Sequence, residues 1–154
     1  MKKVMFISSV GGHLTQLLQL DEIYNNYEYV LVTDRTEVTE KMVDKYNMEF
    51  LVYGSRSNLI KFLFILLFNC FKSLYLFIKY RPDWVVTTGA NACGPMCCLA
   101  KLFGKKVLFI ESFAKRNTPT VTGKLIYKFA DVFVVQWEEL LDYYPDAEYW
   151  GWIY

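Results

Sequence analysis

The stretch FISSVGGHLTQ, residues 6–16, is the most informative segment of the chain for its fold. The residues around its start, 3–8, are nearly all apolar, which is typical of a strand buried on both faces of a parallel sheet. Gly11 and Gly12 follow where such a strand passes into a helix, and His13, the only histidine of the chain, comes next. This order predicts a strand, a glycine loop and a helix at the start of the domain.

The same alternation continues through the 154 residues. Further strands are predicted at residues 29–33, 49–53, 84–88, 106–111 and 131–136. Helices are predicted at residues 13–24, 37–46, 59–80, 94–103 and 123–129, with a short helical turn at 138–144. Alternation of this kind means a parallel sheet with right-handed crossovers. With no linker or internal repeat, the sequence predicts one Rossmann-like, doubly wound α/β domain over residues 1–154.

Charge is balanced overall but uneven along the chain. The formal net charge of +1 argues against a nucleic-acid partner. Between Glu49 and Asp83 there are five basic residues and no acidic one, whereas after Lys128 there are six acidic residues and no basic one. Two regions of opposite sign suggest two different partners.

The first residues and the cysteines indicate a cytoplasmic protein. The opening MKKVMFISS turns polar too early for a signal peptide. Cys70, Cys93, Cys97 and Cys98 match neither a disulfide framework nor a common zinc spacing. We therefore expect reduced thiols and no metal site.

Three loops are predicted at the carboxyl ends of the strands, where doubly wound folds bind ligands. The first carries the glycine pair and His13, and free N–H groups at a helix start favour an anion such as phosphate. The second, TTGANACGPMCCLA at residues 87–100, follows the fourth strand. The third, FIESFAKRNTPTVTGKL at residues 109–125, has Glu111 at the end of the fifth strand. The three loops predict one site.

Simpler interpretations of these loops stay open. The glycine pair alone also fits a tight turn with a capping or exposed histidine, and Glu111 fits a helix cap or an ion pair with Lys115 or Arg116. Asp34 lies at about the distance expected for a ribose contact in a dinucleotide site. The fingerprint G-x-G-x-x-G is absent, however, because the chain reads GGHLTQ from Gly11. The sequence predicts no cofactor.

GGH after the first strand, GANACGP after the fourth and IES after the fifth resemble the N-terminal half of two-domain (GT-B) glycosyltransferases, such as the N-acetylglucosaminyltransferase that forms lipid II. The chain is more similar still to proteins that consist of this half alone. These are the membrane-docking subunit family of the dolichol-pathway N-acetylglucosaminyltransferase and its bacterial counterparts in capsule and exopolysaccharide synthesis. The similarity covers essentially the whole chain.

The resemblance implies a subunit that binds a polyprenyl-diphosphate-linked saccharide, while a partner subunit carries the UDP-sugar site. It implies His13 as the base and Glu111 as support for the acceptor side. The residues implied for the acceptor diphosphate are Ser9, Gly11, Gly12, Gly89, Asn91 and Gly94. A neutral imidazole suits the role of base, because it can take a proton from a sugar hydroxyl near neutral pH.

The first loop departs from the family pattern, since Ser8, Ser9 and Val10 stand where relatives are richer in glycine. The chain alone is expected to transfer no sugar, and capsular or exopolysaccharide biosynthesis is its expected setting. Two other readings stay open: a non-catalytic membrane scaffold that activates the partner, and a self-sufficient nucleotide-binding enzyme.

The segment NLIKFLFILLFNCFKSLYLFIKY, residues 58–80, predicts attachment to the cytoplasmic leaflet of the membrane. A helix over residues 59–79 is about 31 Å long. Lys61, Lys72 and Lys79 lie on one line of it, Asn69 and Ser73 extend that polar edge, and the rest is Phe, Leu and Ile. This pattern is typical of a helix lying in the interface. The residues predicted to meet the membrane are Lys61, Phe62, Phe64, Leu67, Phe71 and Lys72. The alternative is a crossover helix packed on the sheet.

The chain ends in EYWGWIY, residues 148–154, which is unusually aromatic for a terminus. The segment either adds a final strand to its own sheet or contacts the partner subunit. The predicted partner contacts are Trp150, Trp152, Ile153 and Tyr154. The acidic residues before it would favour a basic partner surface.

Overall fold

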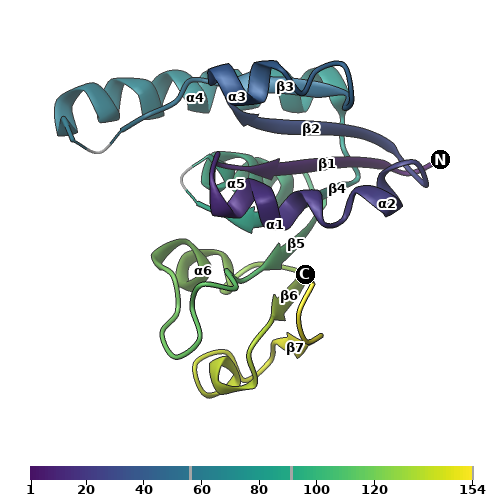
Figure 1. Ribbon diagram of the computed structural model, residues 1–154, viewed down its shortest axis with the longest axis vertical. Helices are drawn as coiled ribbons and strands as arrows, with labels where there is room; N and C mark the ends of the chain where they lie inside the picture. Colours follow the sequence, from purple (N-terminus) through teal and green to yellow (C-terminus); the bar gives the residue numbers. More distant parts are fainter. Residues whose placement is uncertain (56, 91, 154) are drawn as a thin grey trace.

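The computed structural model describes residues 1–55, 57–90 and 92–153. Its centre is a seven-stranded sheet of order β3-β2-β1-β4-β5-β6-β7 in which all neighbours are parallel (Figure 1). The strands are β1 (Lys3–Ser8), β2 (Glu28–Asp34), β3 (Met48–Leu51), β4 (Trp84–Gly89), β5 (Lys106–Ile110), β6 (Val132–Val135) and β7 (Glu148–Tyr149). The strand order reverses between β1 and β4, the switch point of a doubly wound sheet. The predicted Rossmann-like fold is confirmed.

The helices follow the predicted order, but two are shorter than predicted, and the helix predicted at 123–129 spans residues 121–126. They are α1 (Gly12–Leu18), α2 (Asp21–Tyr24), α3 (Glu37–Glu40), α4 (Leu59–Tyr80), α5 (Cys93–Leu102), α6 (Val121–Ile126) and the 3₁₀ helix η1 (Glu138–Asp142). The single helix predicted at 13–24 is interrupted, because Gln19 and Leu20 donate to carbonyls three residues back. The helix predicted at 37–46 ends at Glu40. Turns replace its second half, in which the N–H groups of Met42 and Lys45 donate to carbonyls three residues back.

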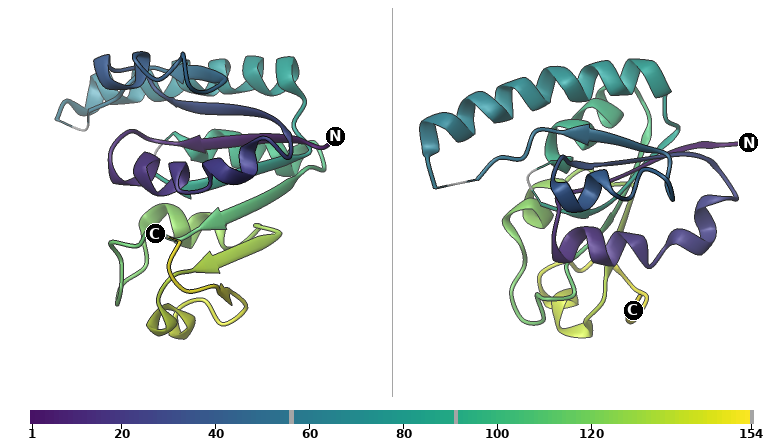
Figure 2. Two further views of the ribbon diagram at one scale, coloured as in Figure 1. Left: turned by 45° about the vertical axis from the view of Figure 1, so that its right-hand side comes forward. Right: turned by 45° about the horizontal axis from the view of Figure 1, so that its top comes forward.

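Two cores of unequal size lie on the two faces of the sheet. Met5 and Ile7 of β1 join the larger core beneath α4, α5 and α6, whereas Val4 and Phe6 join the smaller core beneath α1. Figure 2 shows α4 and α1 on opposite sides of the strands. On the α1 side, the helices among the described residues leave part of β4 and β5 uncovered. A hollow of about 400 Å³ lies there.

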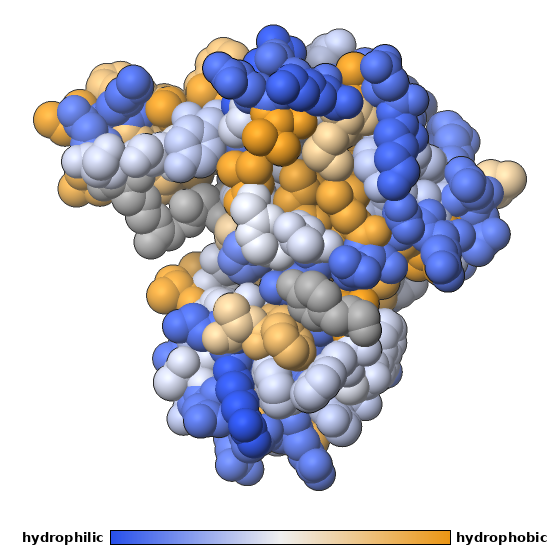
Figure 3. Space-filling model, in the orientation of Figure 1, coloured by the Kyte–Doolittle hydropathy of each residue, from blue (hydrophilic) through white to orange (hydrophobic). Residues whose placement is uncertain are grey.

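Apolar side chains line most of this hollow. Figure 3 shows hydrophobic residues gathered on the face of the molecule that carries α1. The strand residues of the hollow are Val4, Phe6, Trp84, Val86, Leu108 and Ile110. Trp150 and Ile153 of the C-terminal segment form its edge. Trp150 and Ile153 therefore lie beside an uncovered part of the sheet.

Helix α4 extends beyond the rest of the domain. Figure 1 shows its first half projecting past the strands, while its second half lies over them. Its buried residues, Asn69, Ser73, Leu76 and Phe77, lie between the middle of the helix and its C-terminal end. The first half thus overhangs the carboxyl-end edge of the sheet, where the predicted site lies.

Candidate functional site

The glycine loop after β1 is tied to two neighbouring segments. Gly11 has φ of 96°, a backbone conformation that favours glycine. The N–H of Val10 donates to Asp34 Oδ2 at the end of β2, over 3.1 Å. Ser9 Oγ accepts a hydrogen bond from the N–H of Ala92, just before α5, over 3.2 Å. These bonds hold the loops after β1 and β4 together at the switch point.

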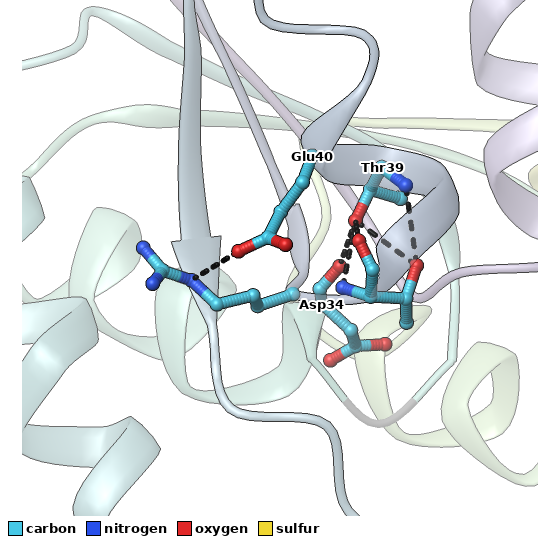
Figure 4. A network of polar contacts seen from close by, with 5 residues as sticks. Asp34, Thr39 and Glu40 are labelled. Carbon is cyan, nitrogen blue, oxygen red and sulfur yellow. Dashed lines mark hydrogen bonds and ion pairs between the residues drawn. The ribbon is translucent and has the colours of Figure 1, made fainter.

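Asp34 is a member of this site that the sequence suggested only as a ribose contact. Its side chain is buried, and burial raises the pKa of its carboxyl group, although the hydrogen bonds from Val10 and Ser9 act in the opposite direction. In Figure 4 this carboxyl group points away from Thr39 and Glu40 of α3. The Thr39 hydroxyl donates to the backbone carbonyl of Asp34 over 2.8 Å. Asp34 is thus held from both sides.

His13 is fixed in one orientation by the strand beside it. Its Nδ1 lies 2.7 Å from the carbonyl oxygen of Thr88, and the Thr88 hydroxyl donates to the His13 carbonyl over 2.6 Å. Because a carbonyl only accepts, Nδ1 carries the proton, and in the neutral ring Nε2 has a free lone pair. A Cβ at Gly89, where φ is 101°, would lie 3.6 Å from His13 Cε1. The site therefore holds an imidazole that can accept a proton at Nε2.

A cleft of about 260 Å³ lies between the loops and α4. Ser9 and Val10 after β1, Asp34 at the end of β2, and Ala90 and Ala92 after β4 form one side of it, and Ser9 and Asp34 bring polar side chains to that side. Helix α4 contributes Phe62, Ile65 and Leu66 to the opposite side, together with Asn69. His13 does not line this cleft, although it follows the glycine loop directly. The cleft thus lies between a wall with the Ser9 hydroxyl and the Asp34 carboxyl group and a mainly apolar wall from α4.

The predicted diphosphate residues gather at this edge only in part. Ser9 lines the cleft, Gly11 and Gly12 lie at the start of α1, and Gly89 ends β4. Gly94 is in the first turn of α5. Asn91 lies outside the described residues. Ser9 already accepts a bond from Ala92, so its hydroxyl is part of the loop framework. Diphosphate binding by this set stays a prediction.

Glu111 lies away from the cleft and is completely buried. Its carboxylate accepts hydrogen bonds from the backbone N–H groups of Ser112 (2.8 Å) and Thr120 (3.1 Å) and from the hydroxyls of Thr120 and Tyr144. These bonds close the loop between β5 and α6. The ion pair with Arg116 is wrong, because Arg116 pairs with Glu139 at 2.7 Å. The geometry gives Glu111 a role in shaping this loop, and its part in the reaction stays a prediction.

Two polar residues of α4, Asn69 and Ser73, lie on its inner side, which corrects their place in the exposed polar edge expected from the sequence. Asn69 and Ser73 are buried against the domain. The Asn69 amide accepts from the N–H of Val52 (2.9 Å) and donates to its carbonyl (2.8 Å), as a neighbouring strand would. Lys79 pairs with Glu49 at 2.6 Å. The inner face of α4 is therefore partly polar because it completes the hydrogen bonds of the chain after β3.

The outer face of α4 is a continuous apolar surface. Its exposed residues are Leu59, Ile60, Leu63, Phe64, Leu67, Phe68, Phe71, Tyr75 and Ile78. By length and composition the helix is able to cross a membrane, and only 17% of its apolar window is buried, unlike a core helix. Of the predicted membrane residues, Phe64, Leu67, Phe71 and Lys61 are exposed, Lys72 is half-buried, and Phe62 lines the cleft.

The C-terminal segment packs on its own sheet and still exposes aromatic rings. Residues Glu148–Tyr149 form β7 beside β6, as the first of the two alternatives predicted. Trp152 contacts the rings of Phe113 and Trp137, with centroid distances of 5.6 and 5.2 Å. Trp150 and Trp152 nevertheless remain 51% and 61% exposed. Tyr154 lies outside the described residues.

Known proteins with similar sequences are glycosyltransferase subunits of one family. The family described as "Oligosaccharide biosynthesis protein Alg14 like" matches residues 4–153. UDP-N-acetylglucosamine transferase subunit ALG14 of Homo sapiens is 25% identical over 176 residues, covering 96% of this chain and 81% of its own length. The subunit of the same name from Schizosaccharomyces pombe is 39% identical over 75 residues, covering 46% of this chain and 36% of its own.

Two solved structures show the same fold. MurG of Acinetobacter baumannii superimposes with a TM-score of 0.73 at 19% identity, covering 90% of this chain and 43% of that protein. The UDP-N-acetylglucosamine 2-epimerase of Rickettsia bellii superimposes with a TM-score of 0.75 at 17% identity, covering 99% and 45%. The chain spans less than half of either protein, and the likeness is one of fold.

Proposed function

The chain belongs to the Alg14-like family of oligosaccharide biosynthesis proteins, and on this premise we propose that it is the membrane-docking, acceptor-binding subunit of a two-component UDP-N-acetylglucosamine transferase. It holds a polyprenyl-diphosphate-linked saccharide at the cytoplasmic membrane surface and presents it to a partner subunit that binds the UDP-sugar. The names of the relatives favour N-acetylglucosamine as the sugar transferred. They give no support to a capsular or exopolysaccharide setting, which stays a prediction.

The observation that carries this proposal is the position of the cleft. The loops at the switch point of the sheet form one wall, and the apolar helix α4 forms the other. An acceptor with a diphosphate and a hydrocarbon chain needs both kinds of wall at one place. The outer face of α4 is exposed and apolar, so it is able to lie in the membrane while its inner face borders the cleft. The diphosphate of the acceptor then lies in the cleft on the inner side of α4, and its hydrocarbon chain runs into the membrane beside the outer face of α4.

His13 supplies the chemistry in this proposal. A hydroxyl of the acceptor sugar attacks the anomeric carbon of the donor, the bond to UDP breaks, and the hydroxyl proton passes to His13 Nε2. His13 lies beyond the glycine loop rather than in the cleft. This separation suits an acceptor whose reacting hydroxyl is one sugar ring away from its diphosphate.

The partner subunit is proposed to contact the C-terminal segment. Trp152 borders a surface hollow lined by Glu138, Glu139 and Asp142, so aromatic and acidic groups lie together. Trp150 and Ile153 edge the uncovered hollow on β4 and β5. Tryptophan buries a large area with few rotamers, and the carboxylates favour a basic partner.

Reconstituted transfer tests the function. The chain and its candidate partner are combined with UDP-N-acetylglucosamine and a polyprenyl-diphosphate sugar in vesicles, and each protein is also assayed alone. We expect turnover only with both, and a drop of about 10²-fold for His13→Ala in the intact complex. Gln19→Ala, an exposed position just after α1, is the matched control. Robust turnover by the chain alone contradicts the two-component proposal, and normal turnover by a bound His13→Ala chain leaves a non-catalytic scaffold.

A further inference from the structure

Two buried glutamines connect distant parts of the chain at the carboxyl-end edge of the sheet. Gln16 of α1 and Gln136, directly after β6, are 3% and 0% exposed. Gln136 Nε2 donates to Gln16 Oε1 and to the carbonyl of Glu111, each over 3.0 Å. Gln16 Oε1 also accepts from the N–H of Phe113 over 3.0 Å. Residues 120 positions apart in sequence thus share one buried hydrogen bond.

The network extends to the end of the chain. The N–H of Ile153 donates to Gln136 Oε1 over 3.3 Å. The amide of Gln136 therefore uses both donors and its acceptor, and each partner allows only one orientation of that amide. A glutamate or an apolar residue at this position is unable to make the same set of bonds. The bonds form a continuous path from the C-terminal segment, through Gln136, to Gln16.

Both ends of this path lie at parts of the molecule with a proposed role. Gln16 comes one helical turn after His13 in α1, so the bonds of its side chain limit how that helix is able to shift. Ile153 follows Trp152, whose ring contacts Phe113. The carbonyl of Phe113 in turn accepts from Trp137 Nε1 over 2.7 Å. The loop after β5 is thereby held between the His13 helix and the C-terminal segment.

We propose that Gln16 and Gln136 are positioning residues that fix the position of the C-terminal segment relative to α1, the helix that carries His13. The proposal rests on the proposed roles of His13 as base and of the C-terminal segment as partner contact. In this arrangement a partner subunit bound at Trp152 has a defined position relative to the imidazole. The donor sugar that it carries is then placed with respect to Nε2 through hydrogen bonds within this chain.

The imidazole itself reports on this link, because His13 is the only histidine. Its ring ¹⁵N resonances are recorded in the full chain and in Gln136→Met and Gln16→Met, which keep side-chain length and remove the hydrogen bonds. Gln19→Met is the matched control at an exposed position beside α1. We expect Gln136→Met to shift the His13 resonances and Gln19→Met to leave them unchanged. A purely local structural role for Gln136 predicts no such shift.

Affinity for the partner subunit is the second measurement. Gln16→Met is expected to weaken association about tenfold, the effect of one or two lost hydrogen bonds, although Gln16 is buried away from the surface. The double variant should bind hardly worse than either single variant, because both remove the same bond. Unchanged His13 resonances in folded Gln136→Met would overturn the proposal, and so would additive losses of affinity.

Ile153→Pro covers the case in which the methionine variants do not fold. It removes the N–H that bonds Gln136 and leaves both buried amides in place. A shift of the His13 resonances in this variant supports the link, and an unchanged spectrum overturns it. If the wild-type chain binds no partner at all, the proposed function fails, while the spectra still determine whether the two glutamines connect the chain end to His13.

Discussion

The outer face of α4 and the C-terminal segment are both exposed and apolar, yet they are built in opposite ways. The α4 face consists of Leu, Ile and Phe with a single Tyr, and lysines are the only charged residues in the helix. The C-terminal segment consists mainly of aromatic residues that retain polar atoms, and Trp150 Nε1 donates to Glu148 over 2.8 Å. Hydrocarbon with lysines suits lipid, whereas tryptophan with carboxylates suits a protein surface.

Removing residues 152–154 is expected to have the largest effect of the variants. It should abolish the function of the C-terminal segment and leave that of the α4 face unchanged. Without Trp152 and Ile153 the proposed partner contact loses its centre, so co-purification with the partner and sugar transfer should both disappear. Binding to lipid vesicles should stay at the wild-type level. Pull-down, transfer assays and vesicle flotation measure the three properties. Normal pairing by the truncated chain would place the partner elsewhere and leave the segment as part of its own sheet.

Replacing Phe64, Leu67 and Phe71 by Ser is expected to have the converse effect. Fully burying such a side chain contributes about 1.5–3 kcal/mol. If the membrane buries about half of each side chain, three residues contribute about 2–4.5 kcal/mol, which corresponds to about fiftyfold or more in membrane affinity. Flotation with vesicles measures the loss, and partner binding should not change. The matched control replaces Leu102, Val121 and Leu125, equally exposed apolar residues outside α4. Equal losses in both triple variants would contradict a specific role for the α4 face.

Asn69→Leu distinguishes the two sides of α4. The substitution leaves the N–H and carbonyl of Val52 without the bonds that Asn69 provides. Val52 is 38% exposed, so water reaches its backbone groups, and the loss is that of two ordinary hydrogen bonds at about 0.5–1.5 kcal/mol each. We therefore expect a loss of about 1–3 kcal/mol in the free energy of unfolding, measured with urea. Vesicle binding should be unchanged. The opposite result, weaker vesicle binding at normal stability, would mean that Asn69 faces the lipid.

The fold was largely predictable, because its strands are short apolar runs between helical segments. The bounds of α4, residues 59–80, were predicted as observed. The orientation of α4 was not predicted correctly, because a periodic pattern does not show which stripe faces the sheet. In α4 the buried stripe includes Asn69, whose polar partner is the backbone of Val52. The sequence does not show which backbone N–H and carbonyl groups lack a partner strand, so it could not predict that Asn69 would bind them.

The candidate site was predictable only where a local motif marks it. The glycine pair and His13 are local, and the structure places them at the expected edge of the sheet. The contacts of Asp34 with Val10 and of Gln16 with Gln136 join residues 24 and 120 positions apart. Such pairs depend on the register of neighbouring parallel strands, which no single segment encodes. Glu111 was marked by its place at a strand end, but its burial depends on donors from Thr120 and Tyr144.

Lys61→Gln is expected to have the smallest effect and to test the electrostatic part of the comparison. One lysine near an anionic membrane contributes about 1 kcal/mol, so affinity for vesicles with phosphatidylserine should fall about fivefold, and less at high salt. Affinity for neutral vesicles and for the partner should not change. Lys79→Gln is the matched control, because Glu49 already pairs with that ammonium at 2.6 Å, and we expect a smaller loss there. If both variants lose the same affinity for neutral and for anionic vesicles, the lysine charges do not contribute to membrane binding. The apolar side chains of α4 alone then distinguish this lipid-binding surface from the protein-binding C-terminal segment.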